Sequence, residues 1–478
     1  MLALDPNKPF NLREFWRIAV RSEKIRATKR AVSGLAKASK HLDRILRESK
    51  VLIYGIHTGF GVLQEDKRRS QGWEQSQREL VESHACGVGE NLKDMEVRGA
   101  MYLRVLTLLK GRSGISLKTF NELIKHINSR KIAKVPSQGS VGACGDLIPL
   151  AHIAKTIFSG IPRGRMGPRD GLALINGTEV SNSVALLAAM QTRQILDWAQ
   201  KISALSLFAV KGKSEAWDPD LIKLKKHPGA IRVSENLAHY LGSFQNTGLP
   251  QDPYSFRAWP HILGVSLELF EESFAKLKRE ADSLKDNPVF LFGPKTNILH
   301  GAHFHGIGVA CAADVTSLAL ALMGLASERR VNFMLKGERG LPKMLKEGNV
   351  SSGLMMAHVT QAALASENKF LAHPASADSI PTNIGQEDVV PMAMHAALKL
   401  KKSAQNSARI LAVEALACQR AIGLSGKCAQ LAKHKKLLDI YKDISQTAGC
   451  EKGYKDISGI LERLAKKFID LNNYFRYT

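Results

Sequence analysis

The sequence is poor in cysteine, tyrosine and tryptophan, and it lacks an N-terminal apolar run. Its 478 residues include 6 cysteines, 8 tyrosines and 5 tryptophans, and no Cys-x-x-Cys pair occurs. Cysteines so few and so scattered argue against both a disulfide framework and a structural zinc site. The first ten residues carry Asp5, Pro6 and Lys8 where a secretory signal needs apolar side chains. We therefore expect a cytoplasmic protein.

Acidic residues are also in short supply. Lys and Arg total 68 against 44 Asp and Glu, which leaves a net charge of +24. Such a charge attracts nucleic acid or anionic membranes through its long-range field. The basic residues are dispersed in short groups, as at 223–226, 399–402 and 433–436, with no aromatic stacking motif or zinc finger. We interpret them as a solvated surface and expect no specific nucleic-acid partner.

Long uninterrupted apolar runs are absent. The longest apolar stretch, residues 307–326, contains Asp314 and is rich in Ala, Gly and Ser. Its length would allow a membrane span, but a buried bundle helix explains this composition better. We therefore expect no membrane association.

Ala- and Leu-rich segments with helical spacing fill most of the chain, whereas strand signals are few and short. Pro391 is expected inside the first turn of the last long helix. The predicted fold is mainly α, with a soft boundary near residue 200 between an N-terminal domain (1–200) and a long-helix domain (201–478). The helical segments are 11–50, 77–87, 93–110, 147–158, 183–210, 260–284, 307–330, 353–372 and 389–423.

The most informative stretch is the glycine-rich loop at residues 138–147. Taken alone, such a loop is better explained by a flexible turn ahead of a helix. A chemical explanation uses its small residues: if the Gly145 nitrogen attacks the Ala143 carbonyl, a five-membered ring closes around residue 144. Glycine eases that approach because it has no side chain. Loss of the residue-144 heteroatom, here the Cys144 sulfur, then leaves an electrophilic methylidene group.

The loop and its neighbours resemble the signature of the histidine and phenylalanine ammonia-lyase family. That family forms 4-methylidene-imidazol-5-one (MIO) from a triad that is usually Ala-Ser-Gly; here the triad is Ala143-Cys144-Gly145. Thiolate is a competent leaving group, so hydrogen sulfide can be lost in place of water. Further family-like blocks follow in family order at 176–178, 251–257, 286–288, 304–306, 327–330, 353–369, 373–376 and 386–388.

The resemblance implies an ammonia-lyase (histidase/fumarase-like) fold with a long central helical bundle. It also implies a homotetramer whose active sites draw on three subunits, which would explain wide apolar helix faces. The implied reaction is elimination of ammonia from L-histidine to give trans-urocanate, through an MIO group that the chain makes autocatalytically.

Tyr54 stands in the glycine loop where the family keeps its catalytic base. A free phenol ionises near pH 10, so its phenolate costs about 4 kcal/mol at pH 7, and nearby positive charge must offset part of this. Arg257 is the candidate carboxylate clamp, because a guanidinium can hold two oxygens at once. Asn176 and Gln251 are expected as amide donors and Tyr254 as a hydroxyl donor near the electrophile.

Substrate choice depends on Ser83, His84 and Glu387. The resemblance implies that a Ser-His pair at 83–84 marks histidine lyases, which also place a glutamate at position 387. His84 can exchange hydrogen bonds with an imidazole, and a carboxylate complements an imidazole N–H. A structural histidine and an exposed glutamate remain the alternatives for these residues.

Two histidines depart from the family pattern. His57 replaces the usual Asn or a similar residue beside Tyr54, and His303 replaces the Asn before Phe304. That Asn normally contributes to the amino-acid carboxylate site, so we assign His303 and Phe304 to substrate binding. Taken alone, the spacing of His300, His303 and His305 would suggest a metal site. No carboxylate partner is evident beside them, so we expect no metal.

Three alternatives stay open. A 2,3-aminomutase would use the same electrophile and return ammonia to the β-carbon, and a lyase for another aromatic amino acid would differ only in substrate. A catalytically impaired paralogue would treat Cys144, His57 and His303 as marks of lost chemistry. Retention of Tyr54 and Arg257 argues against the last.

Overall fold

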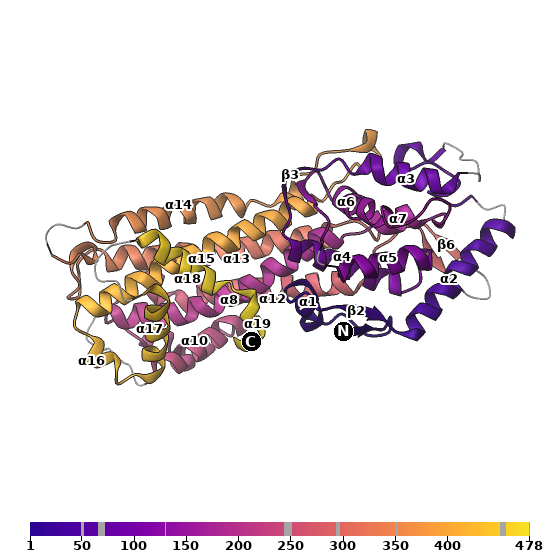
Figure 1. Cartoon of the computed structure of the whole chain (residues 1–478). Coiled ribbons are helices and arrows are strands. Elements are labelled where there is room, and N and C mark those ends of the chain that lie inside the picture. Colours follow the sequence, from indigo (N-terminus) through magenta and orange to yellow (C-terminus); the bar gives the residue numbers. More distant parts are fainter. Residues whose placement is uncertain are drawn as a thin grey trace. The chain divides into compact units, whose positions relative to one another are not determined.

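The computed structural model describes residues 1–48, 52–65, 72–129, 131–242, 251–292, 297–348, 352–449 and 456–477. Helices dominate these residues, as expected, and the strands are only three or four residues long (Figure 1). The helices of eight or more residues are α1 (Leu12–Ala19), α2 (Lys29–Glu48), α3 (Trp73–His84), α4 (Asp94–Leu109), α5 (Leu117–Ile127), α6 (Leu147–Phe158), α8 (Glu179–Ala209), α10 (Pro228–Leu241), α12 (Trp259–Asp282), α13 (Ile307–Met334), α14 (Met355–Leu371), α15 (Ala393–Leu424), α17 (Lys435–Ala448) and α18 (Ile457–Phe468).

Shorter elements connect these helices. The short helices are α7 (Asp170–Ile175), α9 (Pro219–Lys223), α11 (Tyr254–Arg257), α16 (Cys428–Leu431) and α19 (Tyr474–Tyr477), with 3₁₀ turns η1 (Gly61–Glu65), η2 (Glu215–Trp217), η3 (Lys343–Leu345), η4 (Ala375–Ala377), η5 (Asn383–Gly385) and η6 (Leu471–Asn473). Among the described residues the strands form three two-stranded sheets: β1 (Leu2–Leu4) with β2 (Ile25–Ala27), parallel, and β3 (Val88–Asn91) with β4 (Pro136–Gln138) and β5 (Val289–Leu291) with β6 (Asn297–Leu299), both antiparallel.

Two predicted helix boundaries are wrong. The segment 11–50 is two helices, because β2 pairs with β1 between α1 and α2. The last long helix begins at Ala393 and not at 389, so Pro391 precedes it rather than lying in its first turn. Met392 has φ +53°, a left-handed conformation that does not fit within a right-handed α-helix. The helix therefore begins only after Met392.

The chain forms two compact units. The first combines residues 1–187, 274–313 and 374–398, and the second combines 188–273, 314–373 and 399–478. In sequence, four boundaries fall within α8, α12, α13 and α15, and the fifth falls between α14 and η4. The sequence predicted two consecutive domains that meet near residue 200. In the structure, the later segments 274–313 and 374–398 belong to the first unit.

The first unit has its core at the start of α8. Every residue from 170 to 190 is buried, including Ser181, Asn182 and Ser183. Such small polar side chains are accepted in a core only when they are hydrogen-bonded, and Ser183 Oγ donates to the Glu96 carbonyl on α4 at 2.8 Å. Asp146, which follows the Ala143-Cys144-Gly145 loop, is hydrogen-bonded to this buried segment at Ser181.

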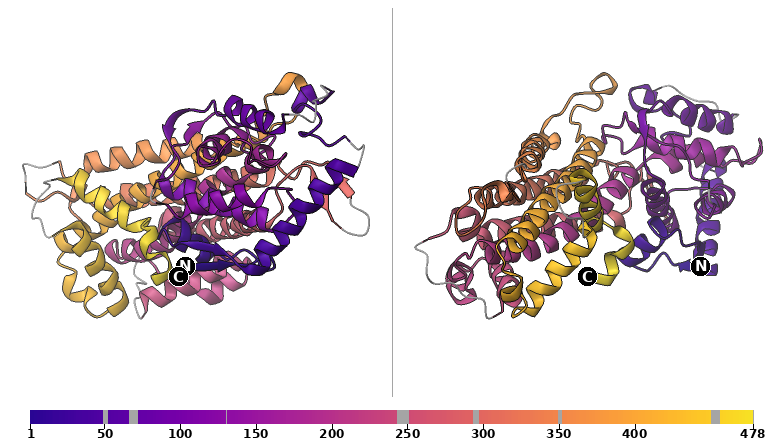
Figure 2. Two further views of the ribbon diagram at one scale, coloured as in Figure 1. Left: turned by 45° about the vertical axis from the view of Figure 1, so that its right-hand side comes forward. Right: turned by 60° about the vertical axis from the view of Figure 1, so that its left-hand side comes forward.

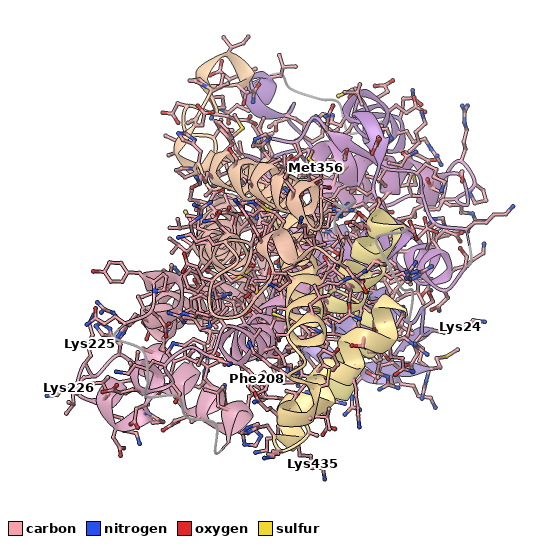
Figure 3. All side chains as sticks on the ribbon, turned by 90° about the vertical axis from the view of Figure 1, so that its left-hand side faces the viewer. Lys24, Phe208, Lys225, Lys226, Met356 and Lys435 are labelled. Carbon is pink, nitrogen blue, oxygen red and sulfur yellow. The ribbon has the colours of Figure 1, made fainter. Side chains whose placement is uncertain are left out.

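The second unit is a bundle in which α13, α14 and α15 run alongside one another (Figures 1 and 2). Its buried ion pair joins Arg330 on α13 to Glu414 on α15, with Nε–Oε1 and Nη2–Oε2 distances of 2.6 and 2.9 Å. Lys225, Lys226 and Lys435 extend outward from this unit (Figure 3), as the dispersed basic residues predict.

Two described helical segments, Asp170–Ala209 and Ile307–Met334, are long and apolar enough to cross a membrane by length and composition. Most of each apolar stretch is buried inside the protein, as in the core helices of many globular proteins.

Candidate active site

The Ala143-Cys144-Gly145 loop lies between β4 and α6 in the first unit. Gly142 and Gly145 adopt φ values of +76° and +74°, which side-chain-bearing residues rarely take. A Cβ at Gly145 would also lie 2.4 Å from the Gly177 carbonyl oxygen. Glycine is therefore required at position 145 by packing as well as by the proposed ring chemistry.

Asp146 anchors the loop to the start of α8. Its N–H donates to the Gly177 carbonyl at 2.7 Å, and its carboxylate accepts from the Ser181 N–H and hydroxyl at 2.7 and 2.9 Å and from the Ser140 hydroxyl at 3.2 Å. Burial raises the pKa of Asp146 to about 6 although these hydrogen bonds lower it. The next helix, α6, follows directly, and Pro149 fits its first turn, where no N–H bond is lost.

Cys144 has polar partners on both sides. Its carbonyl accepts from Asn176 Nδ2 at 3.4 Å, and its thiol donates to Glu387 Oε1 at 2.8 Å. Burial raises the pKa of the thiol, and the Glu387 carboxylate raises it further. Asn176 Oδ1 is buried without a hydrogen-bond partner among the described residues, so this amide has one acceptor unused beside the loop.

Tyr54 lies in the turn before η1. Its hydroxyl accepts from the Gly61 N–H at 2.9 Å, and its ring meets the His300 ring edge-on at 6.5 Å. Burial raises the pKa of Tyr54, and Cys144 and Glu387 raise it further, while the Gly61 N–H and the Arg169 guanidinium lower it. The sequence led us to expect a compensating positive charge; Arg169 supplies some, but within this unit burial outweighs it.

Ser83 and His84 end helix α3. The His84 Nδ1 lies 2.8 Å from the Leu80 carbonyl oxygen, and the Ser83 hydroxyl donates to the same carbonyl at 3.0 Å. A carbonyl can only accept, so Nδ1 carries the proton and Nε2 is left as an acceptor in the neutral ring. Burial lowers the pKa of His84, which favours that neutral form.

These residues surround one cavity of about 470 Å³ in the first unit. A second cavity of about 670 Å³ shares several of its lining residues and is lined by Ala143 as well as Cys144. Of the predicted site residues, seven line the smaller cavity: Tyr54, Ser83, His84, Cys144, Asn176, Phe304 and Glu387. The structure thus brings together residues up to 333 positions apart in sequence, from Tyr54 to Glu387.

The histidines that depart from the family pattern, and those near them in sequence, lie in different surroundings. His57 Nδ1 accepts from the Ile53 N–H at 3.0 Å, which closes the turn that carries Tyr54. His303 is exposed and is not among the residues that line either cavity within the described part of the chain. His300 and His305 line the larger cavity. Among the described residues, no three His, Cys, Asp or Glu side chains are grouped to hold a metal ion.

Gln251, Tyr254 and Arg257 belong to the second unit, whereas the cavities described above are lined by the first unit. The Arg257 guanidinium donates to Gln251 Oε1 and lies 5.0 Å from the centroid of the Tyr254 ring. Tyr254 is 70% exposed. The three form a cluster of their own on α11 and the residues just before it.

Three residues near Tyr54 were not predicted from the sequence as part of the site. Asn287 and Asn383 line both cavities, and Arg169 donates to the Asn287 carbonyl at 2.9 Å. Asn287 stands in one of the family-like blocks, a signal that could have marked it. Asn383 packs against Gly61, a contact over 322 positions that no local pattern reveals.

Known proteins are similar to this chain over most of its length. The aromatic amino acid lyase family model matches residues 10–163 and 158–446. A histidine ammonia-lyase from Vibrio parahaemolyticus is 37% identical, with 82% of each chain covered.

Two solved structures are similar as well. The histidine ammonia-lyase of Trypanosoma cruzi has a TM-score of 0.87 at 28% identity and covers 99% of this chain and 95% of its own. The tyrosine aminomutase of Streptomyces globisporus has a TM-score of 0.90 at 25% identity, with 99% and 98% covered. The predicted fold class and the resemblance to histidine ammonia-lyases are confirmed. The chain belongs to the aromatic amino acid lyase family and is a carbon–nitrogen lyase.

Proposed function

We propose that the protein eliminates ammonia from L-histidine to give trans-urocanate. One observation carries the proposal: Tyr54, Cys144, His84 and Glu387 line the same cavity. In this proposal Tyr54 would serve as the base, Cys144 as the precursor of the electrophile, and His84 and Glu387 as the groups that bind the imidazole. Relatives named histidine ammonia-lyase, at 37% and 39% identity, support the choice of substrate.

The loop fits formation of MIO from Ala143-Cys144-Gly145. Gly145 has no Cβ, which the backbone of Gly177 would exclude, and the Asn176 amide already contacts the Cys144 carbonyl with its Oδ1 unused. Once formed, the group would supply an electrophilic carbon that no unmodified side chain offers. Asn176 would bind the MIO group through its side-chain amide. Asp146 would hold the loop that contains the group against the start of α8.

The substrate's imidazole fits between His84 and Glu387. With its Nδ1 proton held by the Leu80 carbonyl, His84 presents Nε2 as an acceptor for an imidazole N–H. Glu387 Oε2 accepts from the Thr382 hydroxyl, and loss of the Cys144 sulfur would free its Oε1 for the substrate. Both groups accept hydrogen bonds, so together they match the two N–H groups of an imidazolium ring, and a phenyl ring has no N–H to offer them.

Tyr54 is the proposed base that takes a proton from the substrate's β-carbon. Its phenolate costs about 4 kcal/mol at pH 7 even without burial, and burial adds to this. Conversion of Cys144 would remove one of the groups that raise the pKa of Tyr54. The Gly61 N–H and the Arg169 cation would then weigh more in favour of the phenolate.

We also propose a homotetramer, placed in the cytoplasm, in which active sites are shared between copies. Arg257 and the exposed Tyr254 of one copy would meet the substrate's carboxylate in the cavity of another. A guanidinium is suited to this because it binds two carboxylate oxygens at once.

The test is turnover of L-histidine by the purified chain, with ammonia and the product's ultraviolet spectrum measured together. Cys144→Ser is the matched control, because serine is the usual family residue, and it should be active. The similarity to a tyrosine aminomutase makes a β-amino acid product the second candidate. Stable accumulation of β-histidine would favour that candidate, and no turnover of histidine by either form would overturn the proposal.

A further inference from the structure

The second unit contains a cavity of about 470 Å³ that is lined by α8, α17, α18 and the η6 turn. The family match ends at residue 446, so the wall formed by α18 and η6 lies outside the matched region. The proposed lyase chemistry uses none of its residues. It is therefore a site to which no role has been given.

Two oxygen acceptors in this cavity lack donors. Gln194 is only 7% exposed; its Nε2 donates to the Asp470 carbonyl at 3.0 Å, while its Oε1 is buried with no hydrogen-bond partner among the described residues. One helical turn further on lies the half-buried Asp197 carboxylate, which has no ion pair within 4 Å among the described residues, although Lys201, Arg193 and Arg232 are near enough to lower its pKa. Buried polar atoms normally have partners, so this end of the cavity is suited to a ligand that brings N–H donors.

Cations lie in the same cavity. Lys201 Nζ is 4.9 Å from the centroid of the Trp198 ring and forms no ion pair within the described chain, and neither does the exposed Lys466. Lys467 is different, because it is bound to Asp443 and lies 3.1 Å from Thr447 Oγ1. Two ammonium groups are thus available to a carboxylate.

We propose that this cavity binds a small zwitterionic amino acid, with its ammonium group at Gln194 and Asp197 and its carboxylate at Lys201 and Lys466. The ligand would bring N–H donors to Gln194 Oε1 and Asp197 and a carboxylate to Lys201 and Lys466, which neither a simple anion nor a simple amine does. The electrostatics agree. Burial raises the pKa of Asp197 although Lys201, Arg193 and Arg232 lower it, and a bound ammonium would offset that cost of burial.

Glycine is the probe, since it has both charged groups and no ring for the His84 and Glu387 site. Isothermal titration calorimetry on the full chain should show glycine binding that Asp197→Asn weakens at least tenfold. Asp220→Asn is the matched control in the same unit, because Asp220 is 95% exposed, and it should bind as the wild type does. Ethylammonium and acetate should each bind at least tenfold more weakly than glycine.

Asp197→Asn should keep the wild-type kcat and KM for histidine, which shows that the fold and the active site are intact. Unchanged glycine affinity in this variant, or no glycine binding to the wild type, would overturn the proposal. So would ethylammonium or phosphate binding as tightly as glycine. If Asp197→Asn fails to fold, Gln194→Met removes one acceptor at similar volume, and full glycine affinity in that variant would equally contradict it.

Discussion

The two units present their candidate substrate-binding residues in opposite ways. In the first, Cys144, Asn176 and Tyr54 are at least partly buried and held by hydrogen bonds to backbone and to Glu387. In the second, Tyr254 is 70% exposed, and Arg257 has Gln251 as its described hydrogen-bond partner. The first arrangement suits chemistry that needs fixed atoms. The second suits a group that completes a site on another molecule.

The largest effect should come from the buried loop. Cys144→Ala removes the sulfur whose loss would create the proposed electrophile, so the ring could close without gaining a methylidene group. Turnover of histidine should fall below detection while the circular dichroism spectrum stays that of the wild type. Cys311→Ala, at another partly buried cysteine, is the control and should stay active. An active Cys144→Ala variant would remove the loop from the mechanism.

Tyr54→Phe should reduce kcat about 10²- to 10⁴-fold, the range expected when a general base is removed. The ring should still form, because the Tyr54 hydroxyl contacts the Gly61 N–H and not the loop. Tyr240→Phe, a partly buried tyrosine of the second unit, controls for loss of a hydroxyl elsewhere. Steady-state kinetics that show equal activity in both variants would exclude Tyr54 as the base.

Arg257→Met tests the exposed cluster. Removing a charged hydrogen bond of about 1.5–3 kcal/mol should lower kcat/KM about 10- to 100-fold, chiefly through KM. Arg44→Met, at an exposed arginine of the first unit, should have no effect.

Mixing two inactive or weakened variants tests directly whether active sites are shared between copies. If active sites are shared, co-assembled Tyr54→Phe and Arg257→Met chains should recover part of the wild-type activity that neither has alone. No recovery in verified mixed tetramers would place both residues in the site of a single chain.

The last prediction concerns stability and not activity, at the anchor of the loop. Asp146 holds its proton more tightly when folded, with a pKa of about 6, than in the unfolded chain, where it is 3.8. Its contribution to the free energy of unfolding is therefore full below pH 4 and is lost as the pH rises through 6, by about 3 kcal/mol. Chemical denaturation of the wild type and of Asp146→Asn at pH 4 and pH 7 should show this difference, and parallel pH profiles would contradict it.

Local patterns predicted much of the fold and part of the site. Apolar residues at helical spacing located the long helices within a few residues, because burial of one face imposes that period. They missed the start of α15, where the backbone of Met392 decides the boundary. Cys144 could be singled out because glycine and small residues are needed around it.

The contacts that complete the site are long-range. Glu387 meets the Cys144 thiol across 243 positions, and Asp146 meets Ser181 across 35. The resemblance to known lyases pointed to Glu387 as a substrate residue, but nothing in the sequence indicated its bond to the thiol. Asn383 and Arg169 were missed for the same reason, since packing between distant segments positions them.

The central claim is that Cys144 is consumed in making the electrophile. The most direct measurement is the intact mass of the purified chain under denaturing conditions. The account predicts a mass lower than that of the sequence by one water and one hydrogen sulfide, and by two waters in Cys144→Ser. A wild-type chain with the full mass of its sequence and a free thiol at Cys144 would contradict it.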